Sequence, residues 1–172
     1  MGCKTVRDDH PLSRYQIPEA SVIELTQDLT IRPRHTRVFI QDGEAWNYGQ
    51  VDKHYPFCNF EVQERSVDKP QTIRADRFTV IRVVEGNTKV VSTQEIRFAD
   101  TTMRNRFRDW VIWKDGAGIN RFIHHWLHSE RQPNVMRLTC YGGTNTIHEA
   151  QLPTLSDIKR QLGNIVLIKT DH

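Results

Sequence analysis

Short β-favouring runs separated by turn-forming residues recur along most of this sequence, and this pattern limits the folds it can adopt. Runs that are rich in β-branched and aromatic residues and that alternate apolar with polar positions are typical of antiparallel strands. The predicted strands are Val22 to Leu25, Leu29 to Ile31, Thr36 to Gln41, Phe57 to Gln63, Phe78 to Val84, Arg106 to Trp113 and Val135 to Cys140. Because helical patterns are scarce, we expect a mainly β fold, either an antiparallel sandwich or a small barrel.

Glycine-containing segments mark the expected connections. Phe78 to Val84 and Lys89 to Thr93 are predicted to form a hairpin, since the Gly-Asn pair between them supplies the positive φ angles of a tight connection. Gly142 and Gly143 are expected to close the strand that ends at Cys140. Asp115 to Asn120 lacks the acidic spacing of a calcium-binding loop, so we interpret it as a plain loop.

One helix is predicted between Pro153 and Gly163. Thr154 can cap its first turn, Asp157 favours the positive helix start, and Gly163 can take the left-handed conformation that ends it. One face of this helix carries Leu155, Ile158 and Leu162. We expect the helix to pack on the sheet and to lead into a last buried strand, Asn164 to Lys169.

The length of 172 residues suits one domain. Residues 1–20 contain acidic residues and prolines without sustained periodicity, which predicts a flexible N-terminal tether followed by a single β-rich domain over residues 21–172. The net charge of +3 is too small to indicate a nucleic-acid partner by itself. No apolar run approaches the ~18 residues that cross a bilayer, and we expect any secretory signal to be removed or never present.

The three cysteines divide into one and two. Cys3 lies in the tether, whereas Cys58 and Cys140 lie in apolar strand patterns, where they would form a disulfide or remain two buried thiols. A Gly-Cys pair before a polar tether is what remains of a bacterial lipobox, in which Cys3 would carry lipid; the alternative is an ordinary exposed thiol. N-myristoylation is disfavoured because Val6 stands where Ser or Thr is needed.

Two segments, His54 to Val62 and Ser129 to Cys140, resemble those of an uncharacterised family of proteobacterial lipoproteins. The similarity covers most of residues 21–169. The resemblance implies a location in the cell envelope and the same division of the cysteines. It implies no known reaction.

The densest titratable cluster is Phe122 to His128. His124 and His128 would share one face of a helix, or one face of a strand with Trp126 between them. A zinc site needs a third or fourth ligand and the His-Glu-x-x-His signature is absent, so Glu130 is a candidate by position alone. We therefore interpret the cluster as a sheet face or a pH-responsive surface and keep a metal-dependent hydrolase as the alternative. The sequence assigns no catalytic residue and no cofactor.

Arg104, Arg106 and Arg108 would project from one face of an extended segment and could face an anion. Trp110 and Trp113 lie nearby, so a cytoplasmic RNA-binding β-barrel is a further alternative. We instead expect a solvated edge that discourages aggregation, and no nucleic-acid partner.

The preferred function is non-enzymatic. The sequence favours a periplasm-facing domain in the bacterial cell envelope, held to the membrane by a lipid on Cys3, that binds or structurally supports another envelope protein.

Overall fold

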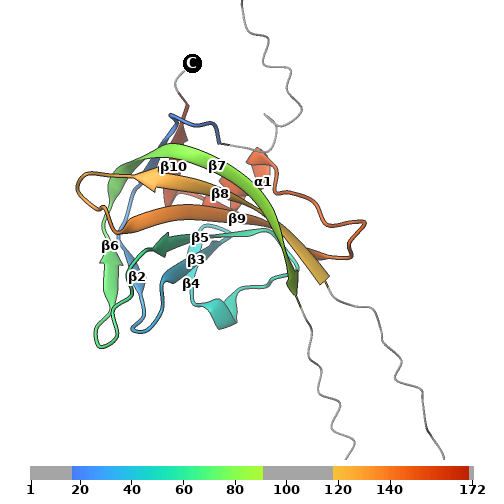
Figure 1. The fold of residues 1–172 in the computed structure, drawn as a ribbon, viewed down its shortest axis with the longest axis horizontal. Coiled ribbons are helices and arrows are strands. Elements are labelled where there is room, and N and C mark those ends of the chain that lie inside the picture. The colour runs from blue at the N-terminus through green and yellow to red at the C-terminus, as the bar shows by residue number, and fades with distance from the viewer. Residues whose placement is uncertain (1–16, 91–117, 171–172) are drawn as a thin grey trace, which may run out of the picture.

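The computed structural model describes residues 17–90 and 118–170 (Figure 1). The strands are β1 (Val22–Leu25), β2 (Leu29–Ile31), β3 (Arg37–Gln41), β4 (Glu44–Trp46), β5 (Phe57–Val62), β6 (Gln71–Ile73), β7 (Asp76–Val90), β8 (Gly118–His128), β9 (Val135–Asn145) and β10 (Val166–Lys169). A 3-10 turn, η2, covers Tyr48–Gln50, and the helix α1 covers Leu155–Leu162. This confirms the prediction of a mainly β, antiparallel fold with one short C-terminal helix.

The main sheet contains eight strands in the order β10-β1-β7-β8-β9-β5-β3-β4, and β2 pairs with β6 in a separate ribbon. Each pairing is antiparallel. Figure 1 shows the long strands β7, β8 and β9 bending across the molecule, with the β2–β6 ribbon at one side. The sheet is curled into a half-barrel.

The helix forms where the sequence predicts it. The Thr154 hydroxyl accepts a hydrogen bond from the Asp157 backbone N–H, and the Asp157 carboxylate accepts one from the Thr154 backbone N–H, which completes a capping box. The helix ends at Gly163, which has φ +55° and whose N–H donates to Lys159. Ile158 and Leu162 are fully buried, so this face packs into the core as expected.

The helix α1 and the short segment that follows it contact strands at both ends of the sheet. At one end, the backbone N–H of Asp42, in the β3–β4 turn, donates to the side-chain oxygen of Gln161. At the other end, the Thr26 hydroxyl, just after β1, donates to the Asn164 carbonyl. The sheet therefore curls around the helix, and we call the face toward α1 the inner face. Its core includes Ile23, Leu25, Val38, Ile40, Cys58, Phe60, Phe78, Val80, Leu127, Leu138 and Cys140.

Packing begins before the predicted domain start at Ser21. Ile17 is completely buried, and its backbone N–H donates to Nε2 of His125 on β8 at 3.3 Å. The Ala20 N–H donates to the Val80 carbonyl. At least residues 17–20 of the predicted tether thus belong to the folded unit, and residues 1–16 lie outside the described part of the chain.

The predicted hairpin at residues 78–93 is wrong, because β7 runs without a turn from Asp76 to Val90. From Thr79 to Val90 it pairs with β8, and Gly86 lies opposite Phe122. The Phe122 ring covers this glycine: a Cβ there would approach Cζ of Phe122 to 2.5 Å. Gly86 therefore makes room for a ring from a distant segment rather than bending the chain.

The glycines of β8 and β9 were predicted to mark a loop and a strand end, but they lie within strands. Strand β9 does not close at the Gly142–Gly143 pair but continues to Asn145, and the expected loop at residues 115–120 is β-structure from Gly118 onward. At Gly142 a Cβ would lie 1.9 Å from the Gln151 carbonyl oxygen, so this glycine permits a close backbone approach. The last strand begins at Val166, and Leu167 in it is exposed. The predicted strand at 106–113 lies outside the described residues.

A candidate binding surface on the outer face of the sheet

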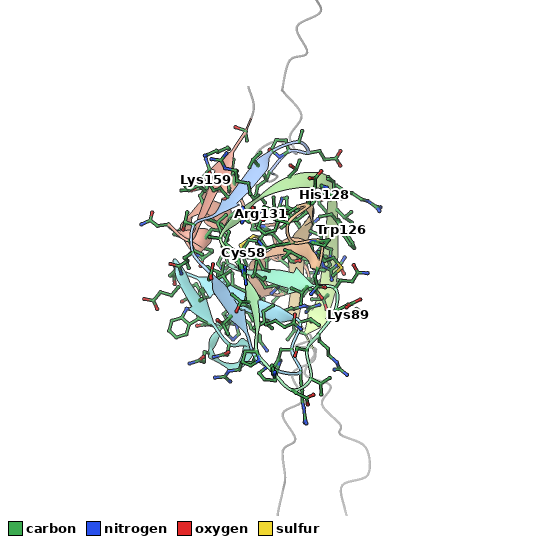
Figure 2. The ribbon with its side chains drawn as sticks, turned by 90° about the vertical axis from the view of Figure 1, so that its left-hand side faces the viewer. Cys58, Lys89, Trp126, His128, Arg131 and Lys159 are labelled. Atoms are coloured by element: carbon green, nitrogen blue, oxygen red, sulfur yellow. A yellow bond between two sulfur atoms is a disulfide. The ribbon has the colours of Figure 1, made fainter. Side chains whose placement is uncertain are left out.

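The outer face of β3, β5, β9 and β8 carries polar and aromatic side chains. Their alternation with the core residues follows from the period of two along each strand. Figure 2 shows Trp126 and His128 on the side of the molecule away from Lys159 of α1, with Cys58 between them. Strand register arranges the outer-face side chains in three rows that cross the sheet.

The first row is charged. It consists of Arg37, Glu61, Arg137, Trp126 and Arg82, each opposite the next on the neighbouring strand. Nη2 of Arg37 donates to Oε1 of Glu61 at 2.9 Å. Nε and Nη2 of Arg137 both lie 2.6 Å from Oε2 of Glu61. The Arg137 guanidinium also lies over the Trp126 ring, 5.3 Å from its centroid.

Glu61 is the negative centre of this row. Burial raises the pKa of its carboxyl, but hydrogen bonds from Arg137 and Arg37 outweigh burial and hold the pKa below its ordinary value. Because one carboxylate is shared by two guanidinium groups, the three side chains together carry a net positive charge. The arrangement fixes both arginines in defined positions on the outer face.

The second row contains His124, Thr139, Asn59 and Phe39. Nδ1 of His124 is hydrogen-bonded to the Thr139 hydroxyl at 2.7 Å. Burial, and then the charge of Arg137, lower the pKa of His124 to about 4, so its imidazole is neutral at pH 7. Asn59 is completely buried, although it lies on the outer face, because the larger side chains around it cover it.

The third row is aromatic. The Phe57 and Tyr141 rings stack with centroids 4.5 Å apart, and Phe122 lies against Tyr141 at 5.7 Å. Burial raises the pKa of the Tyr141 hydroxyl, and the charge of Arg37 opposes this only in part. The Asn59 amide lies close enough to lower this pKa slightly, yet it has no well-aligned hydrogen-bond partner among the described residues. Some members of the three rows are buried, namely Phe39, Phe57, Asn59, Glu61 and Thr139. The side chains that remain at least partly exposed on this face are those of Arg37, Arg82, Phe122, His124, Trp126, Arg137 and Tyr141.

A pocket of about 420 Å³ lies at the β3 end of this surface. Arg32 and His35, from the β2–β3 connection, form one wall. Arg37 and Phe39 of β3 and Asn47, just before η2, form the rest, together with Thr36 and Gly49.

Of the predicted site residues, the structure describes the two strand cysteines and the histidine cluster. Cys58 and Cys140 lie directly opposite each other on β5 and β9, and their sulfur atoms are bonded at 2.10 Å in the buried core. Cys3 and the stripe of Arg104, Arg106 and Arg108 lie outside the described residues. Lipid attachment and anion binding at these positions remain predictions.

His124 and His128 lie on the strand β8 with Trp126 between them, which is one of the two arrangements considered from the sequence. In a strand, four residues span about 13 Å, too far for both imidazoles to bind one ion. Within residues 17–90 and 118–170, no group of three or more His, Cys, Asp or Glu side chains could hold a metal. The cluster is therefore divided, and His125 points to the opposite, inner face.

Sequence reasoning missed the residues that define the surface, above all Glu61, Arg37, Arg137 and Tyr141. They are far apart in sequence and meet only through the register of β3, β5 and β9. The alternation of apolar and polar positions within each strand could have placed each of these residues on the outer face. It could not have shown that they lie side by side, because that depends on the register between strands.

No helix among the described residues is long and apolar enough to cross a membrane. Comparisons of the chain with protein-family models, with curated proteins and with solved structures give no match.

Proposed function

We propose that this protein is an envelope-anchored lipoprotein domain that binds another envelope component, without catalysis, through the outer face of its sheet. The observation that carries the binding role is the composition of this face. Arginine, tryptophan and tyrosine are enriched in protein interfaces because they combine planar hydrogen-bond donors with large rings. Here Arg137 and Trp126 lie opposite each other on β9 and β8, and Tyr141 lies on the same face four residues further along β9.

The proposed location is supported by the cysteines. A buried disulfide such as Cys58–Cys140 is typical of proteins that fold in an oxidising compartment. The chain before Ile17 contains the Gly-Cys pair from which we infer lipid attachment. An anchor at Cys3 would hold the domain at the membrane surface while the outer face binds its partner.

The anchor is tested on the native gene product in its own host. We expect Cys3 to be diacylated or triacylated, so the intact mass should exceed that of the polypeptide by the acyl groups, and the protein should sediment with the membranes. Two acyl chains suffice for stable membrane binding. The variant Cys3→Ser should remain in the soluble fraction. An unmodified Cys3 on a chain that retains Met1 would reject both the lipid and the location.

The binding face is tested by a photoactivated cross-linker placed on the surface in living cells. Position 82 lies on the exposed outer end of the charged row, and position 159 lies on α1 at the other side of the molecule. We expect a discrete protein adduct from Arg82 and at least tenfold less from Lys159. Equal labelling at both positions would contradict the proposal, and an RNA adduct at Arg82 would favour the RNA-binding alternative.

A further inference from the structure

The pocket at the β3 end of the outer face has the chemistry of an anion site. None of the residues that line it is acidic, whereas Arg32, His35 and Arg37 each contribute a nitrogen donor. Arg32 and His35 form no ion pair within the described residues. An anion that enters the pocket therefore meets positive charge on two walls.

One of these donors is held in place before a ligand arrives. The hydrogen bond from Arg37 to Glu61 fixes the guanidinium at the pocket wall, and Arg137 neutralises the same carboxylate. Fixing a donor in advance reduces the conformational entropy that binding costs. The positive field extends along the outer face, since the charges of Arg137 and Arg37 help to lower the pKa of His124.

The pocket also has an apolar side. Phe39 lines it and belongs to a small cluster with Val51 and Phe57, so its ring is held by packing. The volume of about 420 Å³ lies within the usual range for small-molecule sites. It is large enough for an anionic group together with one flat ring.

We propose that this pocket binds a small organic anion, a phosphate or carboxylate carried on a flat apolar group. Arg32 and His35 donate to the anion from the β2–β3 connection, Arg37 donates from β3, and Phe39 contacts the apolar part. The inference rests on the proposed binding function, because the pocket is one end of the outer face. The pocket would give this end of the outer face a preference for aromatic anions.

The test is a titration of the purified full chain with phenyl phosphate, inorganic phosphate and phenol, followed by the backbone amide NMR signals. We expect saturable shifts at Thr36, Asn47 and Gly49 with phenyl phosphate, about fivefold weaker binding of inorganic phosphate, and no saturation with phenol. The variant Arg32→Ala should weaken phenyl phosphate binding about tenfold, since a charge-assisted hydrogen bond is lost.

The matched control is Arg34→Ala. Arg34 is in the same connection and carries the same charge, but it does not line the pocket. Its removal should change binding less than twofold. Two outcomes would overturn the proposal: equal weakening by the two variants, or no saturation by phenyl phosphate below about 10 mM at ~150 mM salt. Either would mean that the ligand is held only by nonspecific charge attraction, which salt screens.

A second arm identifies the source of the anion. Vesicles that contain phosphatidylglycerol present a phosphate without a flat apolar group, so we expect no Arg32-dependent binding to them if the ligand is a free organic anion. Arg32-dependent binding to these vesicles that is as tight as that of phenyl phosphate would show that the anion is a lipid headgroup and would overturn the requirement for a flat group. Neither the ligand titration nor the vesicle assay depends on acylation of Cys3 or on the cross-link from position 82. Failure of this inference is therefore distinguishable from failure of the proposed function.

Discussion

Replacing Cys58 and Cys140 with alanine should lower the free energy of unfolding by about 4.5 kcal/mol in the chain-entropy model. The two cysteines are 82 residues apart, so the cross-link greatly restricts the unfolded chain. In urea the unfolding midpoint should fall by roughly 2 M, given the usual denaturant dependence of small domains. Circular dichroism during urea titration measures it.

The bond lies within the antiparallel β5–β9 pair, in the middle of the main sheet. It joins β5 to β9, and these strands link the β3–β4 end of the sheet to the long strands β7 and β8. Both cysteines are buried in the main core, so alanine also removes two sulfur atoms from packed surroundings. The cavity adds to the entropic loss.

Reduction of the wild-type protein separates these two contributions, because it breaks the cross-link and keeps both side chains. We expect reduced wild type to lie between oxidised wild type and the double variant. Cys3→Ala is the matched control and should leave the midpoint unchanged. If oxidised and reduced wild type unfold at the same urea concentration, the disulfide does not contribute to stability.

The elements that could be predicted from the sequence are those specified by neighbouring residues. The helix α1 begins and ends where Thr154, Asp157 and Gly163 predict, because capping is decided within a few residues. Strands β1 and β2 also match their predicted bounds. Their alternation of buried and exposed positions is visible in the sequence itself.

The errors arose where a distant segment decides the local structure. Gly86 has the signature of a tight turn, and only the Phe122 ring packed against it shows that the chain continues straight. The Asp42–Gly43 turn between β3 and β4 was overlooked, although Asp-Gly is a strong hairpin signal and both residues have positive φ angles. In this case the neighbouring residues do specify the turn, and the sequence analysis did not predict it.

The candidate site could not be assembled from the sequence for a related reason. Arg37, Glu61 and Arg137 become neighbours only when the register of three strands is known. The histidine cluster shows the same limit. Alternation separates His124 from His125, but the sequence does not reveal which of them enters the core.

The structure places His125 inside, and this makes the fold sensitive to acid. Its side chain is completely buried on β8, and Nε2 accepts a hydrogen bond from the backbone N–H of Ile17. Nδ1 has no well-aligned partner among the described residues. Burial lowers the pKa of His125 to about 4, the Leu138 backbone opposes this only in part, and His124 lowers the pKa further.

Between pH 6.5 and 4.5 the free energy of unfolding should therefore fall by about 2 kcal/mol through His125 alone. The folded pKa lies below the unfolded value, so only the unfolded state takes up this proton in that window. The contribution is fully present above pH 6.5 and is lost as the pH falls toward 4. Urea unfolding measured at steps of half a pH unit gives the slope of the free energy of unfolding against pH.

In the variant His125→Gln, the side-chain oxygen can still accept a hydrogen bond from Ile17, but the free energy of unfolding should lose most of its dependence on pH.

The matched control is His124→Gln. Its effect should be smaller, because the His124 ring is only half buried and solvent weakens the effect of its lowered pKa on stability. The lowered pKa values of Glu24, Glu61, Asp76 and Asp157 cost stability mainly below pH 4.5, so they contribute only at the acid end of the window. In the wild type, faster hydrogen exchange at the Ile17 amide should accompany the loss, because a protonated Nε2 no longer accepts its hydrogen bond. An unchanged slope in His125→Gln would show that other groups cause the acid sensitivity.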